Sequence, residues 1–151
     1  MGNDPEDGPE RNALERNRNY NLNERTTRFA EAIVAFANRL PRNAVTIPLV
    51  TQLVKAGTSI GANYREAEDS VSKREFRNKI GYCRKEANET KYWLRVIAKA
   101  VPDRKQEART LWQEADELHR IFSASFNTAD RSLKQAKNAA SNRKHYRAAN
   151  G

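Results

Sequence analysis

The side chains best suited to acid–base or metal chemistry in this sequence are three glutamates, Glu66, Glu86 and Glu89. Carboxylates in a helical bundle can hold a pair of metal ions, but that chemistry also needs Glu-x-x-His motifs on the helices. Neither His119 nor His145 follows a glutamate at that spacing. We therefore predict that the glutamates are structural, that the protein binds no metal and that it is not an enzyme.

The remaining reactive residue types give no other catalytic pattern. Cys83 is the single cysteine, so neither an intramolecular disulfide nor a cysteine-based metal site is possible within the chain. Its inward position in an apolar repeat predicts a small buried residue. Gly57 and Gly61 lack the preceding strand and the Lys-Ser/Thr pair of a phosphate-binding loop. No catalytic residue and no cofactor are predicted.

These two glycines instead interrupt a helical pattern, in the stretch GTSIGANYREAE. Each glycine costs a helix interior roughly 0.8–1 kcal/mol relative to alanine. Because Gly57 and Gly61 are four residues apart, they share one face, where a neighbouring helix can approach closely. Polar residues border this face, and their counterparts lie in the segment KEANETKYWL of the next helix. The predicted polar network across the two helices consists of Ser59, Asn63, Glu66, Glu86, Glu89 and Thr90.

The elements that position these residues are helices, because apolar residues recur at alternating spacings of three and four in four successive stripes. Pro41 and Pro102 end two of the stripes. Ser72 and Glu75 have the spacing of a capping box at the start of the third. Four apolar stripes joined by short connections predict an all-α fold, an antiparallel up-down four-helix bundle.

The bundle is expected to occupy residues 23–126. Residues 1–22 lack apolar periodicity and are predicted to form a disordered polar N-terminal segment. Residues 127–151 carry six basic and one acidic side chain. We expect most of this segment to be a flexible basic tail, although it could continue the fourth helix for a few turns.

Charge gives the clearest indication of function. Lys and Arg outnumber Asp and Glu by 28 to 19, which gives a net charge of +9 and favours an anionic partner. Five cations line one edge of the third helix, namely Arg77, Arg84, Lys85, Lys91 and Lys99. The tail adds Arg143, Lys144 and Arg147. These eight residues are the predicted nucleic-acid contacts, which would bind phosphates without reading bases. An ordinary solvated face is the alternative interpretation.

Three aromatic residues flank apolar stripes that already suffice for a core. Trp and Tyr are enriched at subunit interfaces, so Tyr92, Trp93 and Trp112 are candidates for an oligomer interface. Trp93 fits a wider four-helix core equally well, whereas Tyr92 points away from the stripe and favours the interface.

Two motifs in this chain carry a resemblance to a known family. The run QLVKAGTSIGANYREAE, followed about twenty residues later by KEANETKYWL, resembles the bacterial four-helix-bundle proteins first noted in intervening sequences of large-subunit ribosomal RNA genes. The accessory protein of diversity-generating retroelements is similar to that family. The resemblance covers roughly residues 25–125. Positions recurring in the family pattern match Ser59, Asn63, Glu66, Glu89 and Thr90.

The resemblance implies a four-helix bundle that assembles into a ring-like homopentamer and has no known enzymatic activity. Family members are suspected of binding nucleic acid, and the retroelement relatives also bind a reverse transcriptase. Two hypotheses therefore stay open. One is an oligomer that binds nucleic acid, RNA ahead of DNA, with a strong dependence on salt. The other is a protein-interaction scaffold, such as an accessory subunit of a reverse transcriptase.

The sequence also predicts where the protein works. Its acidic opening MGNDPEDGPERN has no apolar run and does not resemble a secretory signal. No segment approaches the roughly 18 apolar residues that a membrane span needs. We expect a cytoplasmic protein that does not enter a membrane.

Overall fold

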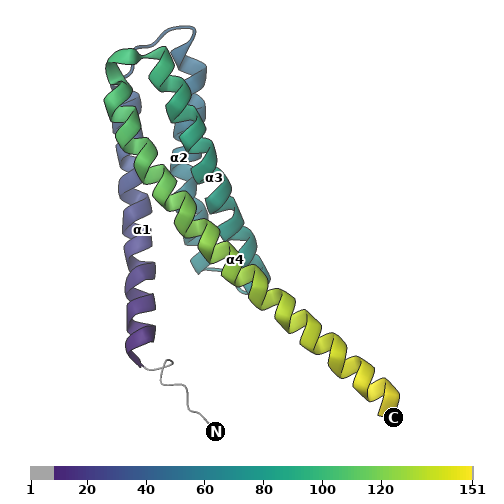
Figure 1. Cartoon of the computed structure of the whole chain (residues 1–151). Helices are drawn as coiled ribbons and strands as arrows, with labels where there is room; N and C mark the ends of the chain where they lie inside the picture. The colour runs from purple at the N-terminus through teal and green to yellow at the C-terminus, as the bar shows by residue number, and fades with distance from the viewer. Residues whose placement is uncertain (1–8, 151) are drawn as a thin grey trace.

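The structure is a computed structural model that describes the backbone of residues 9–150 and the side chains of residues 21–150. It contains four α-helices and one short 3-10 helix, and no strand occurs within this range: α1 Pro9–Asn38, α2 Thr46–Glu68, α3 Lys73–Ala100, η1 Pro102–Arg104 and α4 Lys105–Asn150. Consecutive helices run in opposite directions (Figure 1). The predicted all-α four-helix fold is confirmed.

Local sequence signals set the ends of α3. The Ser72 side chain accepts a hydrogen bond from the Glu75 backbone N–H at 3.1 Å, as the capping-box spacing predicts. Glu75 Oε2 in turn accepts from the Val71 N–H at 3.2 Å, one residue before the cap. At the other end, Pro102 follows Val101 and cannot continue the helix. Both boundaries therefore follow from residue chemistry close by in the sequence.

The core is built from the predicted apolar stripes. Phe36 and Phe122 are its largest fully buried side chains. Cys83 is completely buried, and the Cys83 Sγ lies 3.6 Å from the Ile60 carbonyl oxygen. Burial raises the pKa of the Cys83 thiol to about 12, so the thiolate does not form near neutral pH and the residue serves as packing.

Helix α1 begins earlier than the sequence analysis predicted. It starts at Pro9, inside the segment 1–22 that we expected to be disordered; residues 1–8 lie outside the described part of the chain. Proline suits the first turn of a helix because its missing N–H is unpaired there anyway. No glycine or further proline occurs between Pro9 and Asn38. Nothing in residues 10–22 therefore stops a helix from extending back from the bundle.

The segment 127–151 also differs from the flexible tail that we predicted for most of it. Helix α4 continues without a break to Asn150, further than the few turns considered from the sequence. The reason is local, since no glycine or proline occurs between Asp103 and Asn150. Alanine, lysine, arginine and glutamine are also strong helix formers. An ion pair between Asp130 Oδ2 and Lys134 Nζ, 2.8 Å apart, adds one turn of support.

Candidate nucleic-acid interface

The two glycines of α2 lie where α1 passes closest. A Cβ atom built on Gly57 would stand 2.9 Å from Ile33 Cγ1, and one on Gly61 would stand 3.1 Å from Thr26 Oγ1. Both glycines are buried. Thr26 Oγ1 donates a hydrogen bond to the Leu22 carbonyl at 2.7 Å, so it is satisfied within its own helix. The missing side chains of α2 thus make room for α1.

The six polar residues predicted to join α2 and α3 are arranged differently from that expectation. Ser59 donates to the Lys55 carbonyl at 2.6 Å, Asn63 to the Ser59 carbonyl at 2.9 Å, and Thr90 to the Glu86 carbonyl at 2.7 Å. Side chains of these types readily bond to the carbonyl four residues earlier in a helix, and that local partner is found here.

Of these six residues, Glu66 forms an ion pair between α2 and α3 in the described structure. Its Oε2 lies 2.5 Å from Lys79 Nζ of α3. Lys79 was not part of the predicted network. Glu86 and Glu89 lie near each other on α3, and burial followed by the charge of Glu89 raises the pKa of Glu86. A shared network of all six residues is therefore not what joins the two helices.

Three of the predicted nucleic-acid contacts lie at the seam between α3 and α4. Lys91 Nζ is 2.8 Å from Asp116 Oδ1 and 5.1 Å from the centre of the Trp112 ring. The Lys91 and Asp116 side chains are only 18% and 17% exposed. The hydrogen bond from Lys91 lowers the pKa of Asp116, which keeps the pair ionised at neutral pH.

Arg77 and Arg84 continue this seam toward the start of α3. Arg77 Nη1 lies 3.1 Å from Asp130 Oδ1, and the Arg84 guanidinium lies 4.1 Å from the centre of the Phe126 ring. Of the five cations predicted to contact nucleic acid along one edge of the third helix, Arg77, Arg84 and Lys91 thus lie against α4. Their column borders the core stripe, and α4 packs on that side of α3.

His119 belongs to the same seam. Burial, followed by the positive charge of Lys91, lowers the pKa of His119 below its usual value. The imidazole is therefore neutral at pH 7 and adds no positive charge there. Among the described residues, no group of three or more His, Cys, Asp or Glu side chains could hold a metal ion.

The surface of α3 that faces away from the core is cationic. We call it the outer face of α3; its members follow each other at spacings of three, four or seven residues, and all are exposed: Arg74, Asn78, Lys85, Asn88, Tyr92, Arg95 and Lys99. These seven residues include four cations, and Glu89 is an exposed carboxylate at the edge of the face, four residues after Lys85. Among the described residues, no ion pair engages Arg74, Lys85, Arg95 or Lys99. These four charges are free to bind an external anion.

Sequence reasoning found Lys85 and Lys99 on this face but missed Arg74 and Arg95. The signal was present in the repeat, because Arg74 and Lys85 are eleven residues apart, close to three full helical turns. Choosing the positions diametrically opposite the core stripe, in place of a column beside it, would have selected all four cations.

The three aromatic residues predicted to form an oligomer interface have different environments. Trp93 and Trp112 are partly buried against the core. Tyr92 is 59% exposed and its ring meets the Trp93 ring edge-on, with centroids 4.8 Å apart. Tyr92 thus stands in the middle of the outer face of α3, among its cations. The role of the three residues as an oligomer interface stays a prediction.

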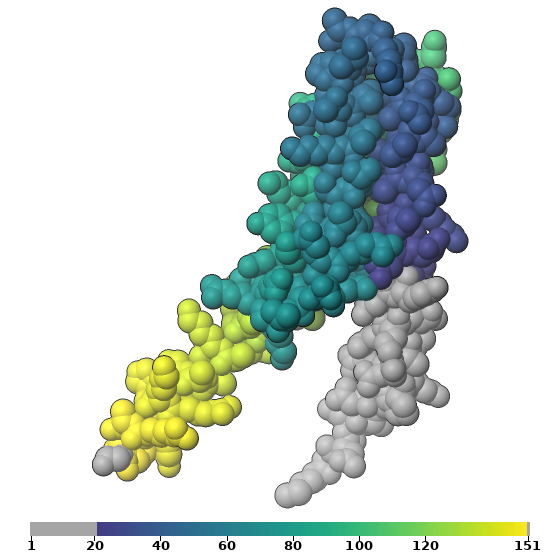
Figure 2. Space-filling view, turned by 180° about the vertical axis from the view of Figure 1, so that it is seen from behind, coloured from purple at the N-terminus to yellow at the C-terminus, as the bar shows by residue number. Residues whose placement is uncertain are grey.

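A second cationic element is the end of α4, which we call the arm, residues 134–150. Every residue of the arm is exposed, and it projects beyond the bundle (Figure 2). It has no acidic residue and carries five Lys or Arg side chains: Lys134, Lys137, Arg143, Lys144 and Arg147. The last three are the predicted tail contacts, here carried on a helix.

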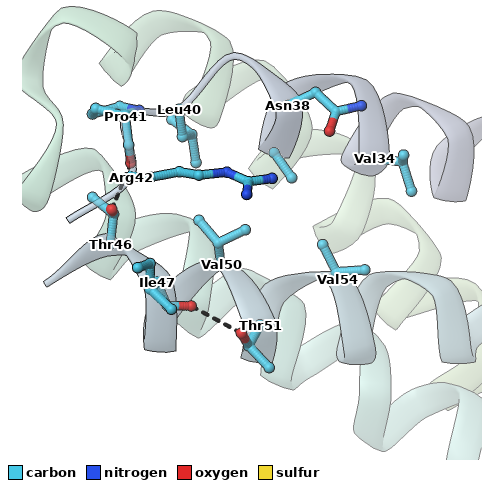
Figure 3. A pocket seen from close by; sticks show the side chains of 11 residues that line it. Val34, Asn38, Leu40, Pro41, Arg42, Thr46, Ile47, Val50, Thr51 and Val54 are labelled. Atoms are coloured by element: carbon cyan, nitrogen blue, oxygen red, sulfur yellow. Dashed lines mark hydrogen bonds between the residues drawn. The ribbon is translucent and has the colours of Figure 1, made fainter. Parts of the chain in front are cut away.

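An apolar groove lies at the opposite end of the bundle, between the end of α1 and the start of α2. Val34, Ile47, Val50 and Val54 line it, and the Arg42 side chain extends along it (Figure 3). Val34 and Ile47 are 42% and 55% exposed. Large apolar side chains exposed side by side often mark a contact surface.

The four helices and the exposed cations of α3 and the arm place this chain in the class of four-helix-bundle proteins with a cationic surface. The chain belongs to the family of 23S rRNA-intervening sequence proteins, whose sequence profile matches residues 18–124. The family expected from the two motifs is confirmed.

The fold also has a counterpart among solved structures. A similar one is the 1.70 Å crystal structure of a protein of unknown function from the S23 ribosomal protein family of Bacteroides thetaiotaomicron. The two sequences are 28% identical, and the match covers 72% of this chain and 97% of the other with a TM-score of 0.66. No curated protein matches the sequence. Among the described residues, none of the helices combines the length and apolarity that a membrane span requires.

Proposed function

We propose that this protein is a non-enzymatic RNA-binding protein of the cytoplasm that contacts phosphate groups through the outer face of α3. The observation that carries the proposal is the set of four exposed cations without ion-pair partners among the described residues, Arg74, Lys85, Arg95 and Lys99, against one exposed carboxylate at the edge of the same face, Glu89. Phosphate contacts of this kind supply affinity with little dependence on base sequence. The family's association with 23S rRNA favours RNA as the nucleic acid.

The first test is a salt series. Each phosphate neutralised changes the slope of log affinity against log salt by about −0.7 on a single strand and −0.9 on a duplex. Four outer-face cations therefore predict a slope of about −3 to −4, and the four arm cations without an ion pair in the described structure would bring it to about −6 to −7. We expect a structured RNA hairpin to show such a slope by fluorescence anisotropy, with similar affinities for unrelated sequences. A slope near zero, or no binding at low salt, would contradict the proposal.

We infer further that copies of the chain assemble, with five copies as the number implied by the family resemblance. We assign the contact to the apolar groove of Figure 3 in place of the interface at Tyr92, Trp93 and Trp112 expected from the sequence, because an interface at Tyr92 would cover the cations of the outer face. A closed ring needs a head-to-tail contact, so the groove of one copy would meet a different surface of the next.

Light scattering coupled to size exclusion tests this assembly. We expect a mass several times that of the 17.3 kDa chain and a lower mass for Ile47→Asp, which places a charge in the groove. Tyr92→Ala should keep the full mass. A wild-type mass of one chain at micromolar concentration would rule out the ring, and dissociation caused by Tyr92→Ala would move the interface to α3.

A further inference from the structure

The outer face of α3 and the arm of α4 follow one another along the molecule. Lys91 pairs with Asp116 and Arg77 pairs with Asp130, so moving back along α3 means moving forward along α4. Continued by the same register, the first residue of α3, Lys73, is level with Lys134 of α4. The arm therefore begins where the outer face of α3 ends.

Together the two elements make a long cationic surface. Helix α3 has 28 residues, about 42 Å at 1.5 Å per residue, and the arm adds about 25 Å. The combined length of about 65 Å corresponds to about 23 base pairs of A-form RNA, whose base pairs rise ~2.8 Å along the axis. Four cations lie on the outer face, with exposed Glu89 at its edge, and five lie on the arm, which carries no carboxylate.

The composition of the arm indicates that it is directed at an external partner. It is polar on all sides and fully exposed, so packing on the bundle does not explain it. Lys134 of the arm forms an ion pair with Asp130. In the described structure, the other four cations of the arm form no ion pair: Lys137, Arg143, Lys144 and Arg147. Like charges on one helix repel each other, and a polyanion alongside would relieve that repulsion.

We propose that the ligand is double-helical RNA of about 23 base pairs, lying along the outer face of α3 and the arm. This inference rests on the proposed function and names the form of the RNA. Proteins that hold single strands rely on aromatic platforms on which bases stack, whereas this surface has two separated tyrosines, Tyr92 on the outer face and Tyr146 on the arm, besides His145. Charges fixed on straight helices suit a stiff duplex, whose phosphates keep a regular spacing.

The mode of contact follows from the shape of A-form RNA. Its major groove is too deep and narrow for side chains to read, so recognition relies on phosphates and on 2′-hydroxyl groups of the shallow minor groove. The arm would then follow the phosphate backbone and would not enter a groove. Binding is expected to depend on duplex length and not on sequence.

The experiment compares blunt RNA duplexes of about 10 to about 30 base pairs with single-stranded RNA and duplex DNA of the same lengths. The wild-type chain is measured beside an arm variant, Lys137→Gln, Arg143→Gln, Lys144→Gln and Arg147→Gln. A control variant makes the same charge change at exposed cations elsewhere, outside the groove: Lys55→Gln, Arg65→Gln, Lys105→Gln and Arg109→Gln. Glutamine is a good helix former, so the helices should persist.

For the wild type, we expect affinity to rise steeply with duplex length and to level off near about 23 base pairs. The arm variant should level off near about 15 base pairs, the length of α3 alone at the ~2.8 Å rise of A-form RNA, and bind the longer duplexes about 10²- to 10³-fold more weakly at physiological salt. The control variant should keep the wild-type length dependence.

The possible failures are distinguishable. Absence of binding to any RNA would overturn the proposed function itself. Equal affinity for single-stranded and duplex RNA, or a length dependence unchanged in the arm variant, would overturn the duplex proposal alone. Tighter binding to duplex DNA would overturn the assignment to RNA.

Discussion

Reversing the charge of the outer face of α3 is expected to abolish RNA binding at physiological salt. The variant combines Arg74→Glu, Lys85→Glu, Arg95→Glu and Lys99→Glu. Removing four phosphate contacts lowers affinity by about 10³-fold at 0.15 M salt, and the added repulsion lowers it further. The salt slope should become less negative by about 3. Anisotropy titrations across a salt series measure both quantities.

This variant should remain folded because all four side chains are exposed and none takes part in a described ion pair. Circular dichroism and thermal melting provide that check. The matching control reverses the charge of a cation at the seam between α3 and α4. Lys91→Glu places a second negative charge beside Asp116 and should lower the melting temperature. If the outer-face variant stays folded and binds RNA as the wild type does, the outer face is only a solvated surface and the scaffold hypothesis gains support.

The second large effect is expected at the contact between α1 and α2. Replacing both Gly57 and Gly61 by leucine should lower the free energy of unfolding by about 2 kcal/mol. Overpacking costs about 1–3 kcal/mol per site, which outweighs the helix-propensity gain of roughly 0.8–1 kcal/mol per site. The Gly57 change should contribute more, since its Cβ would come within 2.9 Å of Ile33. Urea unfolding with a single-transition fit measures the difference.

The control is Ala62→Leu, at an exposed position of the same helix. Surface substitutions of this kind usually change stability by less than about 0.5 kcal/mol. The glycine variants should also be examined by light scattering, because displacing α1 would deform the groove that α1 and α2 share. If the double variant unfolds at or above the wild-type urea concentration, α1 does not pack as closely on α2 as the structure describes.

The sequence alone determined the helices and the core. Spacings of three and four mark the buried stripe of an amphipathic helix, and Phe36, Ile60, Cys83 and Phe122 lie where those spacings place them. The start of α3 at Ser72 was equally local. The tail was misjudged because a helix without an apolar stripe gives no periodic signal, even when its residues favour helix and no glycine or proline interrupts it.

The tertiary structure decided which cations are free. A repeat in one helix defines the side that is buried, but it does not say on which flank the neighbouring helix packs. Helix α4 covers the flank of α3 that carries Arg77 and Lys91 and uses them in ion pairs with its own carboxylates. Arg74 and Arg95 face solvent instead. The helix-to-helix arrangement, which depends on contacts between residues far apart in the sequence, therefore separates the cations that hold the bundle together from those that can bind RNA.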